Sequence, residues 1–103
     1  KSSKISHELD NCWVINNYIN KKIELAASLS NKETGKKIEV YTDEPGIQVY
    51  TGNNLEQKHK RNSGICLETQ HFPNSPNQPS FPSTELSPGQ VFESNTIIRL
   101  MNI

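Results

Sequence analysis

An alternation of apolar and polar residues over positions 22–29 constrains the fold more than any other feature of the sequence. In an extended chain, one face of this run carries Ile23, Leu25, Ala27 and Leu29. The opposite face carries Lys22, Glu24, Ala26 and Ser28. A period of two with one polar face is typical of a half-buried strand in an antiparallel sheet. We therefore predict that residues 22–29 form such a strand.

A second alternating run, residues 37–42, follows a turn in which Gly35 can adopt a positive φ. Two alternating runs separated by a short turn are the pattern of a β-hairpin. The sequence therefore predicts a hairpin over residues 22–42.

The turn after this hairpin is expected at residues 43–46, where a proline presets φ and Gly46 takes the left-handed position. The strand that follows, residues 47–51, has apolar or β-branched side chains at its odd positions. This parity places Gln48 and Tyr50 together on the opposite face of the strand.

No segment shows a sustained helical period. Further β-prone runs lie at residues 12–15, 64–70 and 91–101. Five of the six prolines fall within residues 73–88, but Phe72 and Phe81 lie among them, so we expect an ordered loop packed onto the sheet. Short strands separated by Gly, Pro and Asn turns predict an all-β fold, an antiparallel sandwich or barrel.

Composition excludes several classes of partner. Eleven basic and eleven acidic residues cancel, so no net charge favours nucleic acid or an anionic membrane. No apolar run approaches membrane-spanning length. At 103 residues and 32% hydrophobic content, the chain is one small domain or part of a larger one, with little apolar material for a core.

Two cysteines, Cys12 and Cys66, fit no metal-ligand spacing and lie among apolar residues. We expect two reduced, buried thiols and hence a cytoplasmic protein. The histidines His7, His59 and His71 likewise have no metal-ligand spacing, and no cofactor motif is present. We interpret His71 as a loop or packing residue, because residues three apart on a strand point to opposite faces and so separate it from Glu68.

Three polar residues are candidates for one site: Asp10, Gln48 and Glu68. Carboxylates and amides bind sugar hydroxyls well, because a hydroxyl both donates and accepts hydrogen bonds. Glu68 ends a short apolar run, which leaves two interpretations open. It is either a solvated strand carboxylate or a general base whose pKa is raised by apolar neighbours such as Ile65 and Leu67.

Two long motifs carry a family resemblance. Residues 39–53 (EVYTDEPGIQVYTGN) and residues 63–73 (SGICLETQHFP) closely resemble the aldose 1-epimerase (galactose mutarotase) family. The later elements Asn77-Gln78-Pro79, Phe81-Pro82 and Leu86-Ser87-Pro88-Gly89-Gln90 fit the same family, in the same order. The match runs from about Leu9 to the end of the chain.

The resemblance implies an antiparallel β-sandwich enzyme, of the galactose mutarotase-like supersandwich type, that interconverts the α and β anomers of aldohexoses such as glucose and galactose. In that family the glutamate of the Leu-Glu-Thr-Gln motif is the general base, which implies that role for Glu68. The glutamine of the Pro-Gly-x-Gln motif and an aspartate just before a strand bind the sugar. Those roles fall on Gln48 and Asp10, although Asn11 stands where the family usually has a histidine.

The family enzyme is about three times as long as this chain. The resemblance therefore implies that residues 1–103 are the C-terminal segment of a single β-sandwich domain whose remainder lies upstream. The family's acid histidine and substrate-binding arginine belong to that remainder, so we expect the 103-residue segment alone to be inactive. A non-catalytic carbohydrate-binding sandwich related to the epimerases is the alternative.

Overall fold

The computed structural model describes residues 7–103, which form strands and two short 3-10 helices. The strands are β1 (Asp10–Val14), β2 (Glu24–Asn31), β3 (Lys36–Thr42), β4 (Gly46–Tyr50), β5 (Cys66–Gln70) and β6 (Thr96–Asn102). The helical turns are η1 (Tyr18–Asn20) and η2 (Ser75–Asn77). The predicted all-β fold is confirmed.

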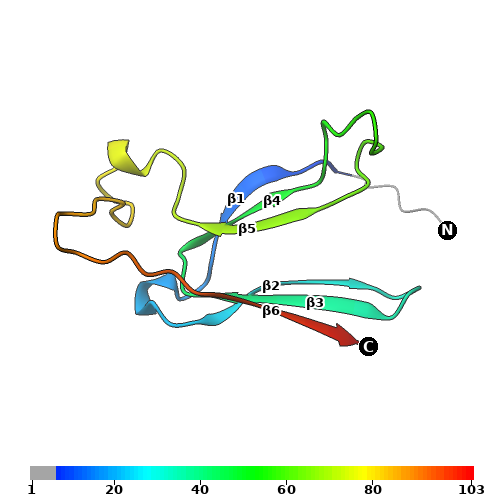
Figure 1. Ribbon diagram of the computed structural model, residues 1–103, viewed down its shortest axis with the longest axis horizontal. Coiled ribbons are helices and arrows are strands. Elements are labelled where there is room, and N and C mark those ends of the chain that lie inside the picture. Colours follow the sequence, from blue (N-terminus) through cyan, green and yellow to red (C-terminus); the bar gives the residue numbers. More distant parts are fainter. Residues whose placement is uncertain (1–6) are drawn as a thin grey trace.

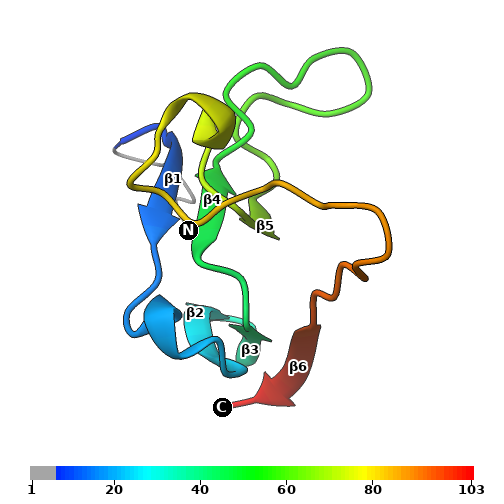
Figure 2. The same cartoon turned by 90° about the vertical axis from the view of Figure 1, so that its left-hand side faces the viewer.

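The strands form two antiparallel sheets that lie one above the other (Figure 1). The first sheet has the order β1-β4-β5 and the second the order β2-β3-β6. Seen from the end, the loop before β6 leaves the first sheet and descends to the second (Figure 2). Among residues 7–103, no helix is long and apolar enough to cross a membrane. The arrangement is a partial β-sandwich.

The predicted hairpin is present as the antiparallel pair β2–β3, with Gly35 at φ 70° in its turn. The predicted alternation is wrong at one point, because a β-bulge interrupts the register between Leu25 and Ala27. Leu25 is opposite Tyr41 and Ala27 is opposite Val40, so the two side chains lie on different faces. Ala27 packs against the core, whereas Leu25 is 51% exposed.

The hydrophobic core between the sheets is small. Among the described residues, its buried members are Ile15, Val40 and Ile47. The total accessible surface is 8100 Å², whereas a self-contained protein of this mass exposes about 5,800 Å². Ile98 and Leu100 of β6 pair with core-facing residues of β3 and yet are 61% and 77% exposed. The inner face of the second sheet is therefore only partly covered.

Polar groups connect the two sheets where the core ends. The hydroxyl of Thr96 lies 3.0 Å from that of Thr42 in β3 and 2.8 Å from that of Thr69 in β5. Just before β6, Asn95 donates from its backbone and side chain to the Asp43 carboxylate, at 3.0 and 2.9 Å. These contacts fix the start of β6 against the end of β3.

The start of β4 depends on a close approach that only glycine permits. Gly46 does not have the predicted left-handed backbone; the glycines with positive φ are Gly35, Gly52 and Gly89. A Cβ at position 46 would instead lie 2.9 Å from Cys12 Sγ and 3.0 Å from the ring of Phe72. The prediction failed because glycine is required here by the close approach of β1 and the proline-rich loop, which are far away in sequence.

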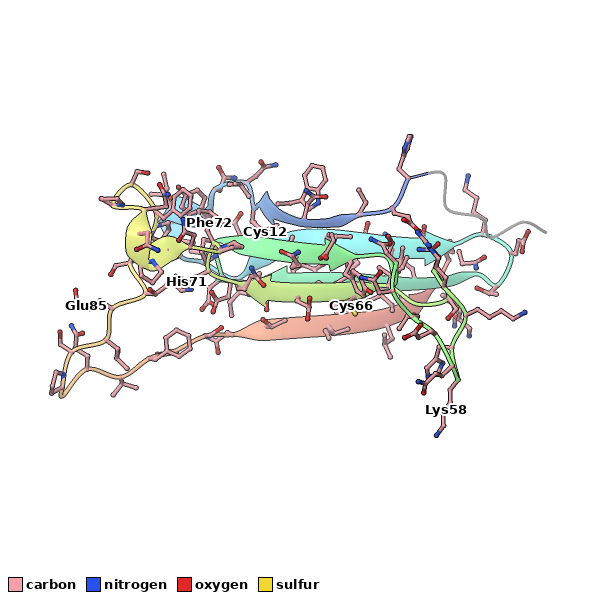
Figure 3. The ribbon with its side chains drawn as sticks, turned by 90° about the horizontal axis from the view of Figure 1, so that it is seen from above. Cys12, Lys58, Cys66, His71, Phe72 and Glu85 are labelled. Atoms are coloured by element: carbon pink, nitrogen blue, oxygen red, sulfur yellow. The ribbon has the colours of Figure 1, made fainter. Side chains whose placement is uncertain are left out.

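The proline-rich loop packs through its aromatic residues, as predicted. Phe72 contacts Tyr18 and Phe81 edge to face, with ring centroids 5.6 and 5.2 Å away. Figure 3 shows Phe72 beside the end of the first sheet, whereas Glu85 lies farther out along the loop. The first half of the loop is therefore packed, and its second half is mostly exposed.

Two other expectations need correction. Both cysteines are free, but only Cys12 is partly buried and Cys66 is exposed, because no other layer of the described residues covers its side of β5. The last strand begins at Thr96 rather than at residue 91, because residues 91–95 have no partner strand among the described residues. Propensity alone does not make a strand without a partner to pair with.

Gly46→Ala is expected to lower the free energy of unfolding by about 1–3 kcal/mol, because the new methyl group must displace Cys12 or Phe72. Gly64→Ala is the matched control, since its Cβ would meet Leu55 at an ordinary 3.9 Å. Denaturant unfolding of the whole polypeptide measures both. Equal stability of the two variants would contradict the close-approach argument.

Asn95→Ala is expected to raise the pKa of Asp43. Partial burial pulls that pKa upward, but hydrogen bonds from the side chain and backbone of Asn95, together with one from the backbone of Asp43 itself, outweigh it and hold the pKa below its ordinary value. Because the folded-state pKa is lowered, the stabilisation is present above the ordinary pKa of about 3.9 and is lost as the pH falls through the folded-state value.

The variant should therefore lose no more than about 1 kcal/mol of stability at neutral pH, and the loss should vanish once Asp43 is protonated. An NMR titration of the Asp43 carboxyl measures its pKa. Denaturant unfolding at neutral pH, and at a pH at which Asp43 is protonated, measures the loss of stability. A stability difference that is independent of pH would contradict it.

Candidate functional site

The register of the first sheet brings the three predicted residues onto one face. Gln48 in the central strand β4 is directly opposite Glu68 of β5 on one side and Cys12 of β1 on the other. Asp10, two residues before Cys12, points to the same face and lies diagonal to Gln48. The three side chains thus come from three adjacent strands, and the Cα positions of Asp10 and Glu68 are about 12 Å apart. This is the outer face of the sheet, away from Ile47 and the core.

A hydrogen bond orders two of these residues. Gln48 Nε2 donates to Asp10 Oδ1 over 2.8 Å. This contact fixes the orientation of the Gln48 amide and leaves its carbonyl oxygen, together with Asp10 Oδ2, available to hydroxyl donors. Asp10 is exposed and Gln48 is half-buried. The pair is therefore a preformed arrangement of acceptors at the surface.

Glu68 is exposed and makes no hydrogen bond or ion pair with any of the residues 7–103. The expected apolar neighbours do not surround it. Leu67 is adjacent in an extended strand, so it lies on the opposite face, where it packs against the core. Within residues 7–103, both oxygens of Glu68 thus lack a partner, and they lie on the same face as Gln48.

Other residues on this face were not predicted as part of a site. Gln70 Nε2 donates to Cys12 Sγ over 3.6 Å, and partial burial raises the pKa of the Cys12 thiol. The hydroxyl of Tyr50, on the same face, accepts a hydrogen bond from the Asn54 backbone N–H over 3.0 Å. The alternation of side chains along each strand could have revealed Gln70 and Tyr50, because each lies two positions from Glu68 or Gln48 on the same strand. Cys12 could be found only from the strand pairing, which places it opposite Gln48.

His71 does not join the Glu68 face, in agreement with its interpretation as a packing residue. Its Nδ1 lies 2.8 Å from Glu44 Oε1, and its ring contacts Phe92. Glu44 is 6% exposed, and among the described residues this carboxylate oxygen has no other partner. The pair lines a cavity of about 410 Å³ that contains none of Asp10, Gln48 and Glu68.

The described residues provide an open sheet face and not an enclosed pocket at Asp10, Gln48 and Glu68. Within residues 7–103, no three His, Cys, Asp or Glu side chains are grouped so that they could hold a metal ion. The chemistry available at this face is therefore hydrogen bonding by an amide and two carboxylates, and proton transfer by Glu68.

The comparison with protein families gives a match over nearly the whole chain. Residues 1–99 match the family described as aldose 1-epimerase. Galactose mutarotase of Sus scrofa is 42% identical over 84 residues, which cover 74% of this chain and 25% of that protein. Galactose mutarotase of Homo sapiens is 39% identical over the same shares.

Similarity extends to bacteria. Aldose 1-epimerase of Escherichia coli (strain K12) is 32% identical over 82 residues, which cover 71% of this chain and 24% of that protein. The chain spans about a quarter of the length of these curated relatives. The family match, the partial antiparallel sandwich and the two long motifs agree with one another, and the chain belongs to the aldose 1-epimerase family.

Proposed function

We propose that this chain is part of an aldose 1-epimerase that interconverts the α and β anomers of aldohexoses such as glucose and galactose. Membership in the family supports the reaction class. The single structural observation that carries the assignment is the alignment of Asp10, Gln48 and Glu68 on one sheet face, with Gln48 oriented by its 2.8 Å hydrogen bond to Asp10.

In this proposal Asp10 and Gln48 hold sugar hydroxyls. The Gln48 carbonyl oxygen and Asp10 Oδ2 accept hydrogen bonds, and Gln48 retains a second N–H donor. Because the backbone positions of the outer two residues are about 12 Å apart and their side chains reach inward, one pyranose ring with its hydroxyls can contact all three at once. A ring held in this way presents its anomeric hydroxyl to Glu68.

Glu68 is the proposed general base. It takes the proton from the anomeric hydroxyl while an acid protonates the ring oxygen, so that the ring opens to the aldehyde. Rotation about the C1–C2 bond and reclosure on the other face complete the exchange of anomers. A general base contributes about 10²–10⁴-fold to such a step, and the unpaired carboxylate oxygens of Glu68 favour this role.

The acid must come from elsewhere in the polypeptide. His71, the histidine closest in sequence to Glu68, contacts Glu44 instead. The open face of the first sheet and the exposed apolar residues of β6 also favour a remainder that covers them. We propose that this remainder supplies the acid, that residues 1–103 alone are inactive, and that the enzyme works in the cytoplasm without a cofactor.

A non-catalytic sugar-binding member of the family is the second candidate. This candidate requires that Glu68 stay exposed in the whole polypeptide, as it is among residues 7–103, because a base that works near neutral pH is usually shielded from water. Sugar binding without acceleration of mutarotation by the whole polypeptide would support this candidate over the enzyme.

Glu68→Gln in the whole polypeptide is expected to lower kcat by about 10²-fold or more while changing KM much less, because the amide keeps the shape but cannot take a proton. Polarimetry on α-D-glucose and α-D-galactose measures the rate. Glu56→Gln is the matched control, since Glu56 is an exposed carboxylate in the loop after β4. Equal mutarotation rates for Glu68→Gln and the parent would refute the assignment.

A further inference from the structure

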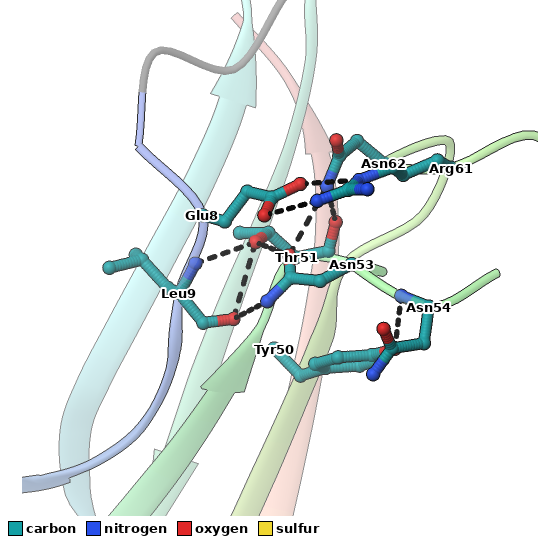
Figure 4. Close-up of polar contacts among 8 residues, drawn as sticks. All are labelled: Glu8, Leu9, Tyr50, Thr51, Asn53, Asn54, Arg61 and Asn62. Carbon is teal, nitrogen blue, oxygen red and sulfur yellow. Dashed lines mark hydrogen bonds and ion pairs between the residues drawn. The ribbon is translucent and has the colours of Figure 1, made fainter.

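The backbone of Leu9, the residue immediately before Asp10, is held by polar contacts from the segment that follows β4 (Figure 4). Its N–H donates to Thr51 Oγ1 over 2.8 Å. Its carbonyl accepts from the Thr51 backbone N–H over 3.0 Å and from Asn53 Nδ2 over 3.2 Å. Both backbone polar groups of Leu9 are therefore bound by two residues, Thr51 and Asn53, of the segment that follows β4.

Thr51 and Asn53 also bind each other. The Thr51 hydroxyl has one proton, and its shortest contact with an acceptor is the 2.6 Å hydrogen bond to Asn53 Oδ1. The Asn53 amide is then oriented so that Nδ2 points to the Leu9 carbonyl. The donors and acceptors form a closed ring from Leu9 N–H through Thr51 and Asn53 back to the Leu9 oxygen. Hydrogen bonds in such a ring polarise and strengthen one another.

Asn62 joins this ring from the far side of the loop. Its Nδ2 donates to the Thr51 carbonyl over 2.8 Å and to Asn53 Oδ1 over 3.2 Å. Its own N–H donates to the Gly52 carbonyl over 2.8 Å. Thr51 is 4% exposed, so this end of the network is shielded from competing water.

β1 has particular need of such support, because it is an edge strand whose only partner among the described strands is β4. Asp10 is its first residue, and the ends of edge strands fray most easily. The pairing of β1 with β4 holds Asp10 from one side only. The contacts to Leu9 add a second anchor one residue before it.

We propose that Thr51, Asn53 and Asn62 are positioning residues that hold the Leu9 peptide and thereby set the place of Asp10 against Gln48. They do not touch the sugar; they act through Asp10, whose carboxylate receives the Gln48 amide over 2.8 Å. This inference rests on the proposed function for its kinetic consequence, but not for its structural one.

Thr51→Val tests the network with nearly unchanged volume, since it removes the hydroxyl that bridges Leu9 and Asn53. The Gln48 side-chain amide signals in the NMR spectrum of the whole polypeptide should shift, and KM for D-galactose should rise about fivefold with a smaller change in kcat. Thr51→Ser keeps the hydroxyl and should restore both values.

Arg61→Ala is the matched control. Arg61 binds Glu8 through two 2.7 Å contacts and so also joins the loop after β4 to the residues before β1. It does not contact the backbone of Leu9. The exposed pair should have little effect on KM or on the Gln48 signals. Equal effects of Arg61→Ala and Thr51→Val would overturn the proposal, because any contact between this loop and the residues before β1 would then position Asp10 equally well.

The NMR measurement and the kinetic measurement separate the positioning network from the proposed function. Shifted Gln48 signals in a protein without mutarotase activity would support the positioning network and count against the proposed function. Unshifted signals and an unchanged KM in an active protein would overturn the network alone. If Thr51→Val does not fold, Asn53→Asp carries the same test, since it removes the donor to the Leu9 carbonyl and sets a carboxylate oxygen against that carbonyl.

Discussion

The register of β4 with its two neighbours is the constraint on which the rest of the structure depends. It places Gln48 opposite Cys12 and Glu68 and turns Ile47 into the core. A slip of one residue would reverse this, because successive side chains of a strand point to opposite faces. The same register that forms the core therefore forms the polar face, and neither can be lost alone.

Two kinds of contact hold this register at its ends. At one end, Gly46 lets Cys12 and Phe72 approach the β4 backbone more closely than a side chain would allow. At the other end, the loop after β4 binds the Leu9 peptide and closes the start of β1. The two ends lie on opposite sides of Gln48, which explains how a small core can support an ordered face. Little of this order comes from apolar burial, since the accessible surface is well above that of a self-contained protein.

Local patterns predicted much of this architecture. Alternation located the β2–β3 hairpin, and parity placed Gln48 and Tyr50 on one face. Two of the misses share a physical cause, because each depends on a partner that is distant in sequence. The close approach at Gly46 involves Cys12 and Phe72, and the late start of β6 follows from its pairing with β3. The bulge near Ala26 lies within the predicted hairpin itself, where alternation alone did not reveal it.

The candidate site divides in the same way. Residue type and parity selected Asp10, Gln48 and Glu68, and the register places them together, whereas their roles came from the family motifs and stay predictions. The ring through Thr51 and Asn53 had no local signal, because its target is more than forty positions away. Of the two interpretations of Glu68, the one with apolar neighbours does not gain support from Leu67, which alternates to the core.

The central claim is that the outer face of β1, β4 and β5 binds an aldohexose with its anomeric hydroxyl at Glu68. A crystal structure of the whole polypeptide with D-galactose tests it most directly. The account predicts a sugar ring over this face, bound by Asp10 and Gln48, with the anomeric oxygen within hydrogen-bond distance of a Glu68 carboxylate oxygen. A sugar bound elsewhere, or one that turns its anomeric carbon away from Glu68, would contradict it.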